Sequence, residues 1–259
     1  MSAQSAPSNP AQSEFLKPFW VRAVCPPWLL ALLLMSLLGG VRYFAVFSTY
    51  QAQPLFFLQY AATWILPFIF LTRNGRGQIG LHEQGTTPLS MGLGALAGAV
   101  YALAVFAIGM TLYGDSRDNW DLSLRDYLRL IELRGVLPPG AVFAIFGVPA
   151  ILFAPIGDEI LFRGFIQETI TRRWGPIAAT LVNCLTFGLT YLYFHAIWQD
   201  SAGIHLRLVS GALAMILFIG AGLVFTLCRL VSGSLWSAVA AHAAFNLTML
   251  GVAILYYMR

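Results

Sequence analysis

Residues 154–164 read APIGDEILFRG, and they place Asp158, Glu159 and Arg163 inside a long apolar run. A charge near the centre of a membrane helix costs roughly 2.5–3.5 kcal/mol on insertion scales, so such groups mark a functional site by default. In a helix, Glu159 and Arg163 are four residues apart and share one face, with the acid first. Asp158 then lies about 100° around the helix, without a partner in the local sequence. The alternative is that Glu159 and Arg163 only fasten a helix end at the membrane interface.

The composition is that of a membrane protein. Hydrophobic residues make up 58% of the 259 residues and charged residues only 10%, and the mean hydropathy is +0.73. A soluble domain carries about 25% charged residues. The net charge of +4 comes from dispersed arginines that mostly flank apolar runs, which excludes a nucleic-acid surface and indicates a lipid bilayer as partner.

The apolar runs predict an all-α fold, a polytopic helical membrane protein of about seven transmembrane helices. The predicted spans are 28–47, 54–71, 89–112, 142–172, 177–198, 208–227 and 235–257. The positive-inside rule places the N-terminus on the cytoplasmic side of the cell (inner) membrane. The basic residues that satisfy it are Lys17, Arg22, Arg73, Arg76, Arg172, Arg173 and Arg229. The first 13 residues are polar and uncharged, which is typical of disorder.

Several charged or sulfur-bearing residues leave alternatives open. Arg42 in the first span either snorkels or faces the bundle interior. The polar segment 113–137 alternates acids, arginines and leucines, and it predicts a short amphipathic helix on the membrane surface, either a solvated connector or a substrate gate. The three isolated cysteines indicate neither a disulfide framework nor a metal site.

Histidines occur in two predicted spans. His242 and Asn246 are four residues apart in the last span, so they present an imidazole and an amide on one face. Phe187, Tyr191 and His195 form a similar stripe in the fifth span, where packing is the commoner explanation. His82 and His205 lie in predicted loops and are interpreted as incidental.

A carboxylate beside a neutral imidazole in a dry cavity supports two chemistries. The carboxylate acts as general base on a trapped water while a polar group stabilises the oxyanion, or the cluster binds a divalent metal that activates the water. Both routes hydrolyse a carbonyl compound. Zinc normally takes about three protein ligands, and the sequence has no HExxH pair. No cofactor is therefore predicted with certainty, and a divalent metal such as zinc remains the alternative.

Three motifs in order resemble those of the CAAX-processing and bacteriocin-immunity (CPBP) family of intramembrane proteases. The family patterns are EExxxR, FxxxH and HxxxN. The corresponding stretches here are Pro155-x-x-Asp158-Glu159-x-x-x-Arg163-Gly164, Phe187-x-x-x-Tyr191, and Gly233-Ser234-Leu235-Trp236 leading to His242-x-x-x-Asn246. The resemblance covers roughly residues 140–250. It implies a disordered and juxtamembrane segment at 1–26, N-terminal transmembrane helices with the amphipathic segment at 27–137, and a protease core at 138–259.

The resemblance also implies roles for the site residues. Asp158 falls where the first glutamate activates the water, and Glu159 falls on the second glutamate. Arg163 falls on the arginine that orders the acids. The residues His242 and Asn246 fall on those that hold the oxyanion or the water.

Two positions depart from the family pattern. Asp158 replaces a glutamate, which retracts the carboxylate by one methylene, and a misplacement of about 1 Å can cost on the order of 100-fold in rate. Tyr191 stands at the second-motif histidine, and the nearest imidazole, His195, is one helical turn away. Either Tyr191 or His195 then assists the reaction.

The function that these observations favour is an intramembrane endopeptidase acting on membrane-associated proteins or peptides. The alternative is a catalytically inactive relative that binds a membrane partner as a scaffold or regulator. A transporter is a third reading, but neither internal repeats nor corresponding broken spans support it.

Overall fold

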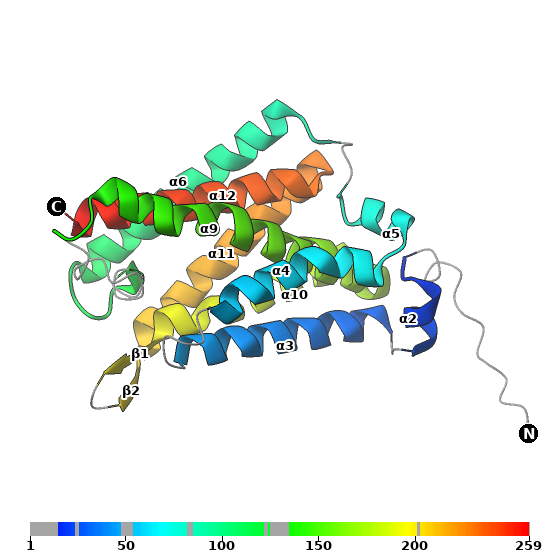
Figure 1. Cartoon of the computed structure of the whole chain (residues 1–259), viewed down its shortest axis with the longest axis horizontal. Helices are drawn as coiled ribbons and strands as arrows, with labels where there is room; N and C mark the ends of the chain where they lie inside the picture. The colour runs from blue at the N-terminus through cyan, green and yellow to red at the C-terminus, as the bar shows by residue number, and fades with distance from the viewer. Residues whose placement is uncertain are drawn as a thin grey trace, which may run out of the picture.

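The computed structural model describes residues 15–23, 26–47, 54–81, 85–121, 124, 135–200 and 203–258. Within these residues, long helices lie side by side, with a short helix at one end of the bundle and a β-hairpin at the other (Figure 1). The helices are α2 (Pro18–Ala23), α3 (Pro27–Phe47), α4 (Pro54–Phe70), α5 (Arg73–Gln78), α6 (Pro88–Tyr113), α9 (Pro139–Glu159), the π-helical η2 (Ile160–Ile166), α10 (Gln167–Ala196), α11 (Leu208–Ser232) and α12 (Leu235–Tyr257).

In the described part of the chain, five helical stretches are long and apolar enough to cross a membrane, and a shorter apolar helix covers Leu58–Phe70. One of the five, Pro139–Leu192, contains two predicted spans, because the chain turns sharply at Gly175. Gly175 has φ +84°, a conformation that glycine adopts without a Cβ penalty, and Pro176 follows it. The prediction of a polytopic helical membrane protein is confirmed.

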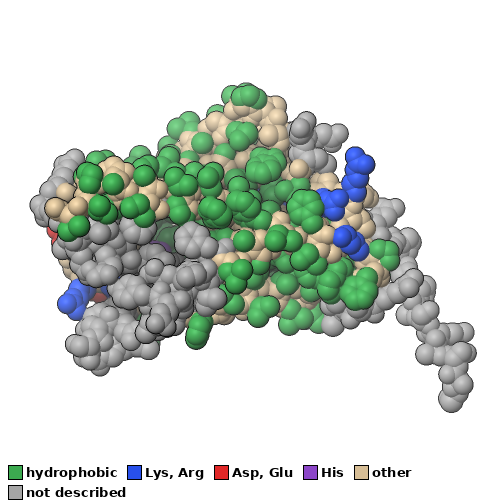
Figure 2. Space-filling view, in the orientation of Figure 1, with side chains coloured by type: hydrophobic (Ala, Val, Ile, Leu, Met, Phe, Trp, Pro, Cys, Tyr) green, Lys and Arg blue, Asp and Glu red, His purple; other side chains and the backbone are tan. Residues whose placement is uncertain are grey.

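The outer surface is apolar over most of the view in Figure 2. Helix α6 shows the reason, since Leu89, Leu93, Leu96 and Val100 are each more than half exposed. A soluble monomer rarely exposes an apolar surface this large, whereas a bilayer covers it. Lys and Arg side chains gather at the end of the bundle that carries α5 (Figures 1 and 2).

Helix α12 lies in the middle of the bundle, packed against α6, α9 and α11. Its start is fixed by Ser234, whose hydroxyl accepts a hydrogen bond from the Trp236 amide. Helix α6 begins with a capping box in which Thr87 and Ser90 bond each other's amides, followed by Pro88 in the first turn. Helices α3 and α4 pack on each other and reach α10 and α9 respectively.

Three expectations at the helix ends change. Residues 73–76, predicted as a basic loop, belong to helix α5, because the Thr72 hydroxyl caps the Gly75 amide. The fifth span was expected to reach Trp198, but α10 ends at Ala196. The chain continues as an antiparallel hairpin of β1 (Ile197–Asp200) and β2 (Gly203–Leu206), so His205 is paired with Trp198 in a strand rather than placed in a loop.

Two predictions, one at the N-terminus and one in the middle of the chain, concern residues that are largely outside the described part. Residues 1–14, expected to be disordered, are among them, as are 122, 123 and 125–134 of the predicted amphipathic segment. Phe15 and Leu16, at the start of the described chain, are each 1% exposed and belong to the hydrophobic core.

Asp121, in the connection that follows α6, is buried outside the membrane-spanning helices. Its Oδ2 has no hydrogen-bond partner among the described residues. Burial raises the pKa of Asp121 to about 7. The native state therefore keeps a proton that the unfolded state releases. The free energy of unfolding should be highest in acid, fall as pH rises from about 4 to about 7, and change no further above that through this group.

We expect Asp121→Asn to remove this part of the pH dependence and to raise the unfolding temperature at pH 8 more than at pH 5. The measurement is thermal unfolding in detergent at both pH values. Asp118→Asn is the matched control, because Asp118 is an exposed aspartate in the same connection. An unchanged pH dependence in Asp121→Asn would contradict the prediction.

Candidate active site

The first motif lies where an α-helix changes into a π-helix. Asp158 and Glu159 end α9, and Arg163 lies in η2. Prolines at 149 and 155 remove two backbone donors from α9, and short π-helical segments occur mostly at functional sites. All seven residues of η2 are buried, as are the two acids. The motif is therefore enclosed by other helices and has no face toward lipid.

Glu159 faces α11 and α12. Its Oε1 accepts a hydrogen bond from Arg163 Nη1 at 3.0 Å and lies 2.8 Å from the Nδ1 ring nitrogen of His242. Arg163 Nη2 donates to the carbonyl of Gly222 in α11, which fixes the guanidinium. The predicted pairing of Glu159 with Arg163 is present, and it lies in the interior, with both side chains 0% exposed, rather than at a helix end on the interface.

Asp158 faces the N-terminal helices α3 and α4. Arg42 Nη2 donates to Asp158 Oδ1, and Arg42 Nη1 lies 3.4 Å from Oδ2. The hydroxyl of Tyr191 donates to the same Oδ2 at 2.5 Å. Arg42 Nε donates to Gln59 Oε1 in α4 at 2.7 Å. Arg42 thus faces the bundle interior, which was one of the two alternatives for it.

Aromatic rings enclose the Glu159 side of the site. The Arg163 guanidinium lies 4.2 Å from the ring centre of Phe187 and 5.2 Å from that of Phe225. The His242 ring stacks on Phe225 with centres 4.8 Å apart. These rings exclude water from the ion pair, and a charge over an aromatic face is stabilised. Phe187, the first residue of the second motif, therefore packs against Arg163 of the first motif and His242 of the third.

Two of the predicted site residues have other contacts. The His195 ring stacks on Phe218 with centres 4.4 Å apart, while Tyr191, one turn earlier, bonds the carboxylate of Asp158. Asn246 donates its amide to the carbonyl of Ala150 in α9 at 2.9 Å, which ties α12 to α9. Of the two candidates in the fifth span, the geometry brings Tyr191 to the acids.

The charges in the cluster balance. The two carboxylates of Asp158 and Glu159 are matched by the two guanidinium groups of Arg42 and Arg163, and each pair is at most 1% exposed. A buried ion pair is tolerated only when good geometry and further hydrogen bonds offset its desolvation. Each acid has its own arginine. The cluster therefore consists of two ion pairs, Asp158 with Arg42 and Glu159 with Arg163, whose acids are adjacent at the end of α9.

The donor set does not fit a metal ion. The described residues contain no group of three or more His, Cys, Asp or Glu side chains that could hold one, and zinc takes about three protein ligands. Arginine and tyrosine donors also point at the oxygens of Asp158 that a metal would need.

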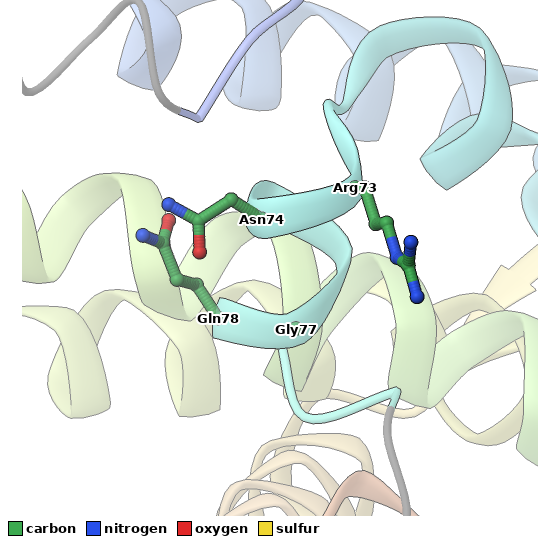
Figure 3. Close-up of a pocket in the computed structure, with 4 residues that line it drawn as sticks. All are labelled: Arg73, Asn74, Gly77 and Gln78. Carbon is green, nitrogen blue, oxygen red and sulfur yellow. The ribbon is translucent and has the colours of Figure 1, made fainter.

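A pocket of about 500 Å³ lies away from this cluster, on α5. Arg73, Asn74, Gly77 and Gln78 line it, with Asn74 and Gln78 side by side and Arg73 pointing away from them (Figure 3). The side-chain oxygen of Gln78 accepts a hydrogen bond from Arg172, and the backbone carbonyl of Gln78 accepts one from Arg229. None of the motif residues lines this pocket, so it carries no part of the proposed chemistry.

The fold defines the class of the protein as an integral membrane protein built of apolar helices, with a buried cluster of acids, arginines and a histidine. Residues 140–248 match the family model described as type II CAAX prenyl endopeptidase Rce1-like. This stretch is similar to the CPBP family, a family of proteases, and the match supports membership of that family. The comparison with curated proteins and the comparison with solved structures each found no match.

Sequence reasoning missed Gln59 and left the role of Arg42 open. Both lie outside the stretch that matches the family. Arg42 contacts Asp158 across 116 residues of sequence, and Gln59 bonds Arg42. The cost of burying a charge in a membrane span could have indicated the contact. Arg42 in an apolar span requires an acidic partner, and Asp158 had no partner in its local sequence.

Proposed function

We propose that this protein is an intramembrane endopeptidase that hydrolyses peptide bonds of membrane-associated proteins or peptides with a carboxylate-activated water. The observation that carries the proposal is the contact of His242 with Glu159, at 2.8 Å, inside a fully buried cluster. Two motifs 83 residues apart meet there. Such a pairing of carboxylate and imidazole in a dry site supports general base catalysis beside an oxyanion donor.

The reaction balances without a cofactor. The carboxylate takes a proton from water, the hydroxide attacks the peptide carbonyl, and the carbonyl oxygen becomes an oxyanion. His242 donates a hydrogen bond to the oxyanion from Nε2, the ring nitrogen that does not contact Glu159, and this step requires a proton on both ring nitrogens. The tetrahedral carbon then expels the nitrogen, which takes the proton back from the carboxyl group, and the C–N bond breaks. Arg163 Nη1 donates a hydrogen bond to Glu159 Oε1 and so orients this carboxylate.

The substrate class follows from where the cluster lies and from the family. A site enclosed by apolar helices receives chains that enter from the bilayer or its surface, and the matching family is described by a prenylated CAAX substrate. With the N-terminus in the cytoplasm, the first motif lies in the cytoplasmic half of the membrane. The proposed substrate is a lipid-anchored or membrane-embedded peptide that reaches the site from the cytoplasmic side.

One observation favours the second candidate, an inactive scaffold that binds a membrane partner. Asp158, at the position of the family's water-activating glutamate, receives hydrogen bonds on both oxygens from Arg42 and Tyr191. A carboxylate held in this way has fewer free lone pairs for water. A measurement of peptide cleavage distinguishes the endopeptidase from the inactive scaffold.

The test is cleavage of a library of lipidated and membrane-anchored peptides by the purified protein in nanodiscs. We expect wild type to cut, and Glu159→Gln and His242→Ala to lose about 100-fold or more of the rate, which is the usual contribution of a general base. His205→Ala is the matched control, because His205 lies in the hairpin. Folded wild-type protein that cuts no peptide would establish the scaffold instead.

A further inference from the structure

The two acids of the first motif differ in how their oxygens are used. Both oxygens of Asp158 accept hydrogen bonds, Oδ1 from Arg42 and Oδ2 from Arg42 and Tyr191. Glu159 Oε1 is likewise bonded, by Arg163 and His242, but Glu159 Oε2 is buried and has no hydrogen-bond partner among the described residues. A buried carboxylate oxygen without a partner costs free energy, so its presence at a site of this kind needs a reason.

Arg42 is held in place from three sides. Its Nε donates to Gln59, its guanidinium lies 4.9 Å from the ring centre of Tyr60, and Tyr191 lies on the far side at 5.8 Å. The side chain is 1% exposed although arginine stays protonated in proteins. A guanidinium held by these contacts fixes the orientation of the Asp158 carboxylate that it bonds.

We infer that the two acids divide the work: Glu159 is the water-activating base, acting through its free Oε2, and Arg42 is a positioning residue that holds Asp158 as a charged, non-reacting partner. This inference rests on the proposed function. It moves the base from the first to the second acid of the motif. It also adds a residue from α3, outside residues 140–248, to the site.

The same arrangement accounts for both departures from the family pattern. Asp158 is one methylene shorter than glutamate, which leaves room beside α9 for the guanidinium of Arg42. Tyr191 supplies a hydroxyl that donates to this carboxylate, with the Arg42 guanidinium 5.8 Å from its ring. Asp158, Tyr191 and Arg42 therefore form one unit, and the water-activating chemistry stays with Glu159 and His242.

The test is a mutant cycle on kcat and KM for the peptide that wild type cuts best. Arg42→Gln leaves a buried, unpaired carboxylate next to Glu159, so we expect kcat to fall about 100-fold with KM little changed. Arg42→Lys keeps the charge and should retain more activity than Arg42→Gln. Combining Arg42→Gln with Asp158→Asn removes both charges, and we expect it to recover about tenfold or more of the lost kcat.

Two results would overturn the inference. The first is a single Asp158→Asn variant, with Arg42 intact, that is as inactive as Glu159→Gln, because Asp158 would then be the base. The second is an Arg42→Gln loss that Asp158→Asn does not relieve at all, because Arg42 would then act on something other than Asp158. A purely structural role of Arg42 would lower the amount of folded protein without changing kcat per folded molecule.

Thermal unfolding of wild type, Arg42→Gln, Asp158→Asn and the double variant separates this inference from the proposed function. We expect the effects of Arg42→Gln and Asp158→Asn to be strongly non-additive, since the two groups are in contact. If wild type cuts nothing, the proposed function fails, and the assignment of Glu159 as base is overturned with it. Additive unfolding effects with an active wild type would instead overturn the Arg42–Asp158 unit alone.

Discussion

Replacing Arg163 by glutamine is expected to remove most of the folded protein, and with it any cleavage activity. Arg163 is fully buried, bonds Glu159 and the Gly222 carbonyl, and lies over the ring of Phe187. Removing one partner of a buried ion pair costs about 3–5 kcal/mol, because an uncompensated charge stays behind. The free energy of unfolding of a protein is about 5–15 kcal/mol in total, so this single change removes a large part of it.

Arg172→Gln is the matched control within the same stretch of helix. Arg172 also pairs with the acid four residues before it, Glu168, at the same 3.0 Å, but the side chains are 29% and 21% exposed. An exposed pair of this kind contributes about 0–1 kcal/mol. The measurement is the unfolding temperature in detergent together with the yield of monodisperse protein. Equal losses in the two variants would contradict the argument, and Glu159→Gln added to Arg163→Gln should restore part of the stability.

The helices were predictable because the bilayer sets their length and composition. A run of about 20 apolar residues is a membrane span almost regardless of neighbours, and the structure has helices at each of the seven predicted runs. The predictions that were wrong concerned the ends of the helices. The Thr72 cap turned a basic loop into α5, and the β-hairpin pairing ended α10 at Ala196, two residues before Trp198.

The site was predictable only where it is local. Glu159 and Arg163 are one helical turn apart, so their spacing alone predicts the pair that the structure contains. The partner of Asp158 is 116 residues away, and no periodicity in the sequence links it to Arg42. The π-helical turn that carries Arg163 also leaves no simple sequence pattern. The family resemblance predicted the order of the motifs along the chain. The contacts between distant residues, such as Arg42 with Asp158, depend on how the helices pack.

The last prediction concerns a glycine that lies outside the matched stretch and sets the position of His242. Gly98 in α6 packs so closely on α12 that an added Cβ would overlap the backbone carbonyl of Ala241, the residue before His242. Small residues of this kind let membrane helices approach each other. Gly98→Ala must therefore push α6 and α12 apart.

We expect Gly98→Ala to destabilise the protein by about 1–3 kcal/mol, the usual cost of overpacking. We also expect cleavage to fall about 100-fold, because a shift of about 1 Å in a catalytic group has that effect. Gly92→Ala is the control: Gly92 lies on the same helix with no atom within 4 Å of an added Cβ, and alanine there gains about 1 kcal/mol of helix propensity. Unfolding temperature and kcat should therefore rise or stay level in Gly92→Ala and both fall in Gly98→Ala. A Gly98→Ala protein that is destabilised but cuts at the wild-type rate would show that the α6–α12 contact supports the fold without positioning His242.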